Sequence, residues 1–417
     1  MKRLLIFLTC SLFIVSSNLI YAQGTDSFKE ITGKVLDSNN KNPLVFADIV
    51  VDNSNISTVT NSDGEFLLKI PADLLNSAIT ITHLGYKKKG INIASLKDGE
   101  KILLTQAITK LEEVSITTTS MNARELVLET LKTKRNIYNN ENTLMTAFYR
   151  ETIKKRRRNA SLSEAVVKIH KQPYNNYRRD RIELVKARKN TDYTKLDTLA
   201  LKLQGGPFSN LYTDMIKYPE FIFNEDNIEY YIFDFDSATR INDKHIYVVN
   251  FRQKKGIKTP LYYGKLYIDA QTKALTNAVY SLNVSNRALS SQMYVRKKPR
   301  KVDVYPTEAT YRVNYRTKDG KWHYAYSNIS LTFKVNWKRK LFNNVYTLSS
   351  EMAITDWEIQ NTKIAEIRSQ LLRPTTILTE RASGFSDPRF WGAYNVIEPD
   401  KSIQSAIKKI QKQLKRT

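Results

Sequence analysis

The alternation of apolar and polar side chains constrains this fold more than any other feature of the sequence. Between residues 329 and 337 the odd positions hold Ile, Leu, Phe, Val and Trp, whereas Thr332, Lys334 and Asn336 lie between them. Successive strand residues point to opposite faces, so this pattern is typical of an antiparallel sheet with one buried and one solvated face. Other strand-like segments are residues 230–235, 245–251, 264–269, 278–284 and 311–315. We therefore predict a mainly β chain whose larger antiparallel β-sheet domain covers residues 143–360.

The first residues carry a secretory pattern. Lys2 and Arg3 precede an apolar stretch that polar residues interrupt, and Ala22 offers a small residue for cleavage. This order predicts a signal peptide over residues 1–22 rather than a membrane span. Cys10, the single cysteine, lies inside that segment. A cleaved chain would have no disulfide and no thiolate, so its domains must depend on packed cores.

Short strand-like segments separated by turn residues fill residues 29–108. Residues 37–41 have turn chemistry, Asp63–Gly64 is a hairpin signal, and Phe66, Leu68 and Ile70 follow with period two. Turn signals that recur at such short intervals predict a small β-sandwich.

Several motifs in this region carry a family resemblance. They are the segments GKVLD from Gly33, PLVFA from Pro43, TNSDGEF from Thr60 and the pair Gly85–Tyr86. In this order and spacing they resemble the carboxypeptidase-regulatory-like domain, which implies a seven-stranded, prealbumin-like sandwich. Exported Bacteroidetes proteins and TonB-dependent receptors carry this module at their N-termini, and residues 111–114 resemble the segment that follows it in those receptors.

Two further resemblances concern the rest of the chain. Residues 147–151, 162–167 and 390–399 are similar to an uncharacterised family of exported Bacteroidetes proteins, which implies a shared architecture and no established activity. For the exported chain we predict a location in the periplasm or in association with the outer membrane. Residues 264–269 resemble a strand of the lipoprotein-carrier half-barrel, which implies a carrier of lipid or lipoprotein.

Helical patterns flank the larger domain. Residues 121–140 switch to a period near 3.6 and predict a connector helix. The C-terminal segment, residues 384–417, contains a predicted amphipathic helix in which Ile403, Ile407, Ile410 and Leu414 form one stripe and Asp400 caps the start. This helix either docks its stripe on its own domain or lies on an anionic membrane.

Basic residues dominate the charge of the chain. The formal net charge is +25, which favours polyanionic surroundings, and for an exported chain these are phosphorylated lipid head groups or acidic glycans rather than nucleic acid. The alternative is a basic surface that only keeps the protein soluble. Residues 177–181 and 296–301 form two basic loops. The candidate anion-contact residues are Lys154, Lys155, Arg156, Arg157, Arg158, Lys408, Lys409 and Lys412. The alternative for the run from Lys154 to Arg158 is a solvated hairpin tip.

Catalytic and metal-binding patterns are weak. Asp234 and Asp236 form a pair of carboxylates at strand spacing, which more simply marks a wet face than acid–base chemistry. The histidines, His83, His170, His245 and His323, have no second His or Glu within four residues, so zinc-ligand spacing is lacking. The sequence therefore predicts no catalytic residue, no metal ligand and no cofactor.

The function predicted from sequence is a non-enzymatic cell-envelope protein that acts through binding surfaces. Its partner would be an outer-membrane or periplasmic protein or an anionic envelope component, with peripheral membrane contact. One alternative is a half-barrel carrier of lipid or lipoprotein. The other is a hydrolase with an unrecognised site, for which Asp234, Asp236 and His245 are the candidates.

Overall fold

The computed structural model describes most of the chain. It covers residues 28–107, 122–191, 204–223, 227–236, 239–241, 244–296, 298–338, 343–360, 371–384, 387 and 389–414. The predicted signal peptide, residues 1–22, and the receptor-like segment 111–114 lie outside the described residues.

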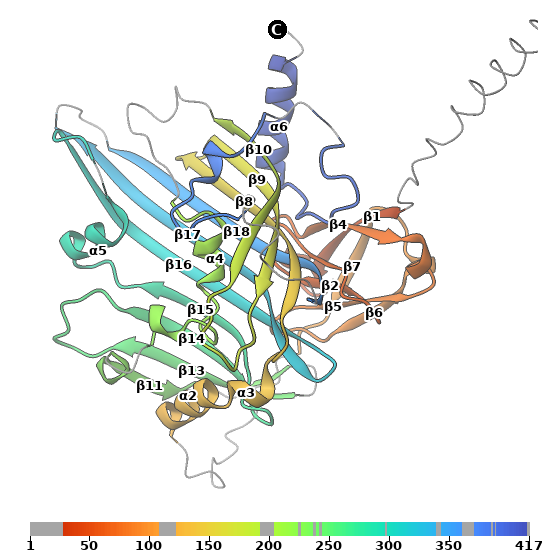
Figure 1. Cartoon of the computed structure of the whole chain (residues 1–417), viewed down its shortest axis with the longest axis horizontal. Coiled ribbons are helices and arrows are strands. Elements are labelled where there is room, and N and C mark those ends of the chain that lie inside the picture. The colour runs from red at the N-terminus through yellow and green to blue at the C-terminus, as the bar shows by residue number, and fades with distance from the viewer. Residues whose placement is uncertain are drawn as a thin grey trace, which may run out of the picture.

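The N-terminal unit is a sandwich of seven strands, as the family resemblance implies. Its two sheets have the orders β4-β1-β7 and β3-β2-β5-β6 (Figure 1). The strands are β1 (Phe28–Asp37), β2 (Asp48–Val51), β3 (Ser57–Val59), β4 (Glu65–Pro71), β5 (Ala78–Thr82), β6 (Lys89–Asn92) and β7 (Glu100–Leu104). The alternating apolar residues, among them Val35, Ile49 and Leu68, fill its core with essentially no exposed surface.

The hairpin signal of the sequence shapes the turn before β4. Asn61 Oδ1 accepts hydrogen bonds from the backbone N–H groups of Asp63 and Glu65, both at 2.9 Å. Gly64 has a φ of 75°, and a Cβ there would lie 2.7 Å from the carbonyl oxygen of Val35. Only glycine fits this position, which explains the Asp-Gly pair.

The larger unit is one curved antiparallel sheet (Figure 1). Its order is β10-β9-β8-β18-β17-β16-β15-β14-β13-β11, and β12 also pairs with β13. The strands are β8 (Thr143–Lys155), β9 (Arg158–Lys171), β10 (Arg181–Thr191), β11 (Tyr231–Phe235), β12 (Thr239–Ile241), β13 (Lys244–Gln253), β14 (Tyr262–Asp269), β15 (Leu275–Leu282), β16 (Val302–Lys318), β17 (Lys321–Trp337) and β18 (Asn344–Ile359). The mainly β fold class and the large antiparallel sheet are thus confirmed.

Helices and short turns complete the chain. The helices are α2 (Ala123–Lys132), α3 (Lys134–Ile137), α4 (Pro207–Leu211), α5 (Arg287–Tyr294) and α6 (Lys401–Leu414). Short 3-10 turns occur at Ala72–Leu74, Ile93–Ser95, Pro219–Phe221, Ile228–Tyr230 and Leu378–Glu380. Within the described part of the chain, no helix has the length and apolar character needed to cross a bilayer.

The connector differs from the single helix that its periodicity predicts. Asn122 and Glu125 form a reciprocal capping box that starts α2. The hydroxyls of Thr130 and Thr133 donate to the carbonyl oxygens of Leu126 and Glu129, at 2.9 and 2.8 Å. Such back-bonding by threonine weakens a helix, and the chain breaks at Thr133 into α2 and α3.

One face of the large sheet, here called the α4 face, is covered by α4 and the residues that follow it. Phe208, Leu211, Met215 and Ile216 are buried there against strand residues such as Tyr324. Segment 204–223 therefore covers this part of the sheet.

The opposite face, the sandwich face, carries the N-terminal sandwich and a C-terminal strap, defined as residues 389–400. Phe148 and Tyr326 of the sheet pack against Phe46 of the sandwich and Trp391 of the strap. Asn395 ties the strap to β4, because its side chain accepts from the Lys69 N–H at 2.7 Å and donates to the Lys69 carbonyl oxygen at 3.1 Å.

The larger domain extends beyond the predicted boundary at residue 360. Leu371 and Ser383 form bridges with Glu183 and Arg188 of the edge strand β10. Residues 371–384 thus belong to the larger domain, where they cover an edge that would otherwise leave backbone groups unpaired.

Candidate functional site: a basic rim of the large sheet

Strand register gathers basic residues at one end of the large sheet. Lys155 at the end of β8 pairs with Tyr346, and Tyr346 pairs with Phe333 near the end of β17. Val302 at the start of β16 pairs with Trp337. The hairpin between β8 and β9 and the loop before β16 therefore lie at the same end. They are three strand spacings apart across the sheet and, because Phe333 pairs with Pro306, four residues apart along it, or about 20 Å in all. The basic rim, as defined here, consists of Lys154, Lys155, Arg156, Arg157, Arg158, Arg296, Lys298, Arg300, Lys301 and Lys338.

The third basic loop does not join the rim. Residues 177–181 lie between β9 and β10, next to Lys171, which pairs with Thr143 at the start of β8. In an antiparallel sheet this is the opposite end of the strands. The structure thus brings together two of the three basic loops that the sequence singles out.

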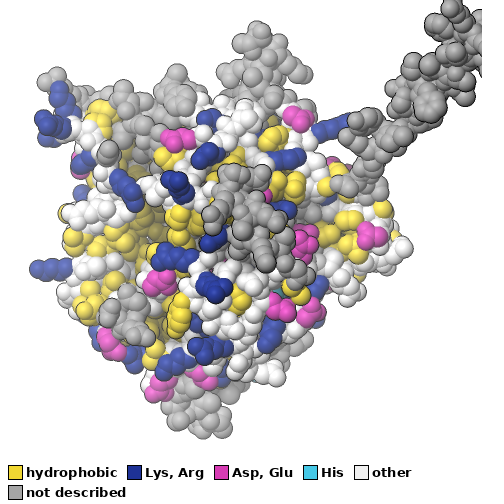
Figure 2. All heavy atoms as spheres, viewed as in Figure 1, with side chains coloured by type: hydrophobic (Ala, Val, Ile, Leu, Met, Phe, Trp, Pro, Cys, Tyr) yellow, Lys and Arg dark blue, Asp and Glu magenta, His cyan; other side chains and the backbone are white. Residues whose placement is uncertain are grey.

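The hairpin tip presents its charges to solvent. Arg156, Arg157 and Arg158 are exposed, whereas Lys154 and Lys155 are half-buried. Arg156 adopts a φ of 53° in the turn. Elsewhere on the rim, Lys298 pairs with Asp303 at 3.3 Å. Figure 2 shows Lys and Arg side chains at the upper left edge, above a stretch of hydrophobic side chains.

The start of α6 packs beside this hairpin. Lys154 Nζ donates to Ser402 Oγ at 3.2 Å, and Asn159 Nδ2 donates to the Ser402 carbonyl oxygen at 3.0 Å. Ile403 is buried against Leu162 of β9, and Ile407 packs against the same cluster. The first turns of α6 are therefore docked on the sheet.

The basic residues of α6 are described only in part. Lys408 is exposed, whereas the side chains of Lys409, Lys412, Ile410 and Leu414 lie outside the described ones.

The residues named for a hydrolase are not assembled into one site. Asp234 pairs with Arg252, and Asp236 pairs with Lys265 at 2.7 Å, so both carboxylates form ion pairs at the protein surface. Asp234 lies opposite Asn250 on β13, and His245 is five residues from Asn250 on that strand, about 17 Å away.

The other histidines have separate surroundings. His83 Nε2 lies 3.1 Å from the Val45 carbonyl oxygen, His170 Nδ1 lies 2.6 Å from Gln360 Nε2, and His323 stacks on Trp357. Among the residues that the structure describes, no three His, Cys, Asp or Glu side chains gather as metal ligands would.

The structure contains two buried ion networks that the sequence did not predict. On the α4 face, Lys171 Nζ lies 2.8 Å from Asp180 and 2.7 Å from Asp214, and all three are buried. Tyr174 and Tyr315 donate their hydroxyl hydrogens to Asp214, each at 2.9 Å. The two tyrosines and Lys171 together anchor segment 204–223 to the sheet.

The second network lies on the sandwich face. Arg150 contacts Glu164 at 2.8 Å and Glu351 at 3.1 Å, and its Nη2 donates to the Ile397 carbonyl oxygen at 2.7 Å. Arg188 contacts the other oxygen of Glu164 at 2.7 Å. Every charged group in the two networks has a partner. We therefore assign both networks a structural role, which is to hold segment 204–223 and the C-terminal strap against the sheet.

Glu151 on the α4 face allows a test of buried charge. Burial raises its pKa to about 7, and the Tyr149 hydroxyl donates to it at 2.9 Å. Because the folded-state pKa lies above the unfolded value of 4.5, the fold favours the protonated form of Glu151. The resulting contribution to stability is fully present below pH 4.5 and is lost as pH rises through 7.

We therefore expect Glu151→Gln to raise the free energy of unfolding at pH 8 by about 1–3 kcal/mol, with no gain at pH 4.5. Urea unfolding at both pH values measures this difference. Glu308→Gln, at an exposed position of β16, is the control and should change little. An equal gain at both pH values would contradict the assignment.

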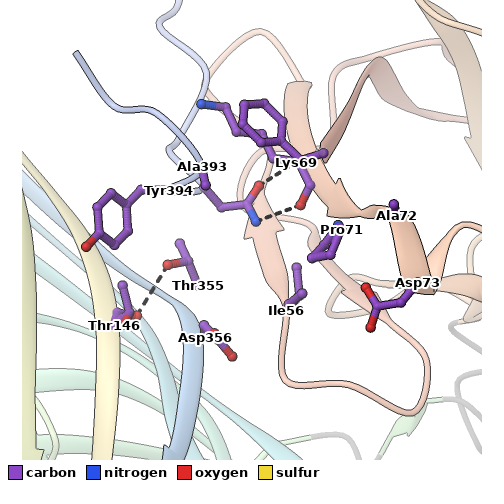
Figure 3. Close-up of a pocket in the computed structure, with 12 residues that line it drawn as sticks. Ile56, Lys69, Pro71, Ala72, Asp73, Thr146, Thr355, Asp356, Ala393 and Tyr394 are labelled. Atoms are coloured by element: carbon purple, nitrogen blue, oxygen red, sulfur yellow. Dashed lines mark hydrogen bonds between the residues drawn. The ribbon is translucent and has the colours of Figure 1, made fainter. Parts of the chain in front are cut away.

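Two hollows lie between the sandwich and the large sheet. The smaller, of about 520 Å³, is lined by Lys69, Pro71 and Asp73 on the sandwich side and by Thr146 and Asp356 on the sheet side (Figure 3). The larger, of about 1000 Å³, lies between β2 and β5 of the sandwich and β15 to β17 of the sheet. We call the larger one the interdomain cleft.

Solved structures match this chain at low similarity. A DUF1329 family protein from Desulfovibrio piger is 9% identical, over 59% of this chain and 97% of that one, with a TM-score of 0.24. A LolA superfamily protein from Nitrosomonas europaea is 8% identical, over 60% and 98%, with a TM-score of 0.23. MucB, solved in complex with MucA, is 10% identical, over 58% and 100%, with a TM-score of 0.19. At these scores the likeness carries no conclusion about function.

Sequence comparison identifies the N-terminal unit. No curated protein matches the chain. The family model described as CarboxypepD_reg-like domain matches residues 31–116, which confirms the resemblance seen in the glycine and turn motifs. The N-terminal part of this protein is therefore a carboxypeptidase-regulatory-like domain.

Proposed function

We propose that this chain is a non-enzymatic protein of the cell envelope that binds an anionic envelope component through the basic rim. The observation that carries the proposal is the strand register, which places the exposed residues Arg156, Arg157 and Arg158 at the same end of the sheet as the loop 296–301. An extended anionic surface can contact both segments at once, because they lie at the same end of the sheet. The secretory pattern of residues 1–22 supports an envelope location.

The packing of the α4 face makes the carrier alternative less favourable. An acyl chain on this face would have to displace Phe208, Leu211 and Met215, which are buried against the strands. Displacing such side chains exposes apolar surface at a cost of about 1.5–3 kcal/mol each. The residues named for the hydrolase alternative do not form a catalytic site, since Asp234 and Asp236 are both ion-paired.

Charge reversal at the rim tests the proposal. We expect the purified protein to bind phosphatidylglycerol-containing vesicles, with affinity that falls as salt rises. The triple variant Arg156→Glu, Arg157→Glu, Arg158→Glu should reduce that binding at least tenfold, since each basic residue near an anionic surface contributes about 1 kcal/mol. Vesicle co-sedimentation over a salt series measures the loss.

A matched control lies at the opposite end of the same sheet. Arg178→Glu, Arg179→Glu, Arg181→Glu changes the net charge by the same amount, also at exposed positions. Equal losses in both triple variants would mean that net charge, and not the rim, drives binding. Absence of binding to anionic vesicles at low salt would also overturn the proposal.

A further inference from the structure

Unpaired polar atoms converge on the interdomain cleft. Within the described part of the chain, His83 Nδ1, Asn314 Oδ1, and both Nε and Nη1 of Arg316 are buried without a hydrogen-bond partner. All three residues line the cleft, His83 from the sandwich and the other two from β16. A buried polar atom left unsatisfied costs about 1–3 kcal/mol, so such a group of atoms calls for a partner.

These groups are held in place by their remaining bonds. Arg316 Nη2 donates to the Ile354 carbonyl oxygen at 3.0 Å, and Arg316 Nη1 lies 3.5 Å from Asp48 Oδ1. His83 Nε2 faces the Val45 carbonyl oxygen at 3.1 Å, so it must carry the ring hydrogen, which leaves Nδ1 as an acceptor. The cleft therefore presents fixed donors on Arg316 and fixed acceptors on His83 and Asn314.

The lining of the cleft narrows the chemistry of a ligand. Carboxylates and amines both line it, for example Asp48 and Lys318, so neither an anion nor a cation is favoured by charge alone. Hydroxyl groups satisfy donors and acceptors together, because each can donate once and accept twice. Phe46 and Trp322 add aromatic surface to the lining.

Strand pairing argues against a peptide ligand. Four of the strands that line the cleft, β2 and β5 of the sandwich and β15 and β16 of the sheet, each have a hydrogen-bonded neighbour on both sides. No open backbone edge of these four strands is left to which a peptide could add as a further strand. Recognition by these four strands must therefore come from side chains, whereas β3, which lines the cleft through Val59, is an edge strand.

We propose that the interdomain cleft binds a neutral oligosaccharide, with Arg316 donating to its hydroxyl oxygens and Asn314 and His83 accepting from its hydroxyl groups. The cleft volume, about 1000 Å³, is at the upper end of the usual range for small-ligand sites. This site is independent of the basic rim and of anion binding.

Ligand-observed NMR on the purified protein tests the proposal. The probes are maltose, cellobiose, lactose and N,N′-diacetylchitobiose, and triglycine serves as the peptide probe. At least one sugar should show saturation transfer, and Asn314→Leu and Arg316→Gln should each weaken its binding at least tenfold. Arg252→Gln, at an exposed site on β13, should leave the affinity unchanged.

Several outcomes would overturn the proposal. They are absence of transfer to all four sugars, sugar binding that Asn314→Leu and Arg316→Gln leave unchanged, and binding of triglycine alone. Thermal unfolding of each variant checks its fold. If Arg316→Gln fails to fold, Asn277→Trp blocks the cleft by bulk from a half-buried position on β15, and it should abolish sugar binding.

Discussion

Replacing Arg150 with methionine should lower the free energy of unfolding by about 3–5 kcal/mol, because the change leaves Glu351 without its cation and Glu164 with Arg188 alone. Arg150 is 2% exposed and Glu164 is fully buried. Burial by itself raises the pKa of Glu164, yet Arg150 and Arg188 bring it below its ordinary value. Arg150→Met also removes the hydrogen bond to the Ile397 carbonyl oxygen, which holds the C-terminal strap.

Urea unfolding at pH 7 measures this loss. Arg252→Met is the control, because Arg252 and Asp234 form an exposed pair whose side chains are 56% and 50% accessible. Exposed pairs contribute about 0–1 kcal/mol, so this control should remain close to the parent. Adding Glu351→Gln to Arg150→Met should recover part of the loss. Equal stability of Arg150→Met and Arg252→Met would rule out the buried network as a major source of stability.

Lys171→Met should have a comparable effect, about 3–5 kcal/mol, on the other face of the sheet. Lys171 is 1% exposed and forms ion pairs with both Asp180 and Asp214. Without it, two carboxylates remain buried next to each other, and Asp214 belongs to the segment 204–223 that covers the α4 face. We therefore expect this segment to be the first to open.

Limited proteolysis combined with urea unfolding separates local opening from global loss. In Lys171→Met, cleavage should begin within residues 204–223. Adding Asp180→Asn and Asp214→Asn should restore part of the stability, because amides are cheaper to bury than charges. Lys265→Met, which breaks an exposed pair with Asp236, is the matched control. A Lys171→Met protein as stable and as protease-resistant as this control would show that the cluster does not anchor the segment.

Local sequence patterns predict the large sheet and the sandwich. They do not predict every position at which the side chains of a strand switch from one face to the other. In β17, Tyr324 packs on the α4 face, whereas Tyr326, two residues later, packs on the sandwich face. A β-bulge at this point, where Asn314 pairs with Tyr326 and Tyr315 pairs with Tyr324, reverses the alternation. Since aromatic residues are buried on both faces here, the sequence offers no polar residue to mark the switch.

The candidate site could be predicted only in part, for a similar reason. The run from Lys154 to Arg158 is evident in the sequence, but its neighbour at residues 296–301 becomes a neighbour only through the register of β8, β18, β17 and β16. The buried networks were missed because single charged residues within strands, such as Arg150 and Lys171, look like members of a wet face. They are buried because their partners arrive from other strands and from segment 204–223.

The two hydrogen bonds between Asn395 and β4 affect the order of folding during biosynthesis. Asn395 lies 326 residues after Lys69, and its side-chain amide bonds both the N–H and the carbonyl oxygen of Lys69. A chain that emerges from its N-terminus completes the sandwich long before this amide arrives, so the outer border of β4 remains without this bond until the strap has been made. Such a long-range closure is intrinsically slow. The last step of maturation thus falls to a short stretch near the C-terminus, and a truncated product would leave that border open to unwanted strand pairing.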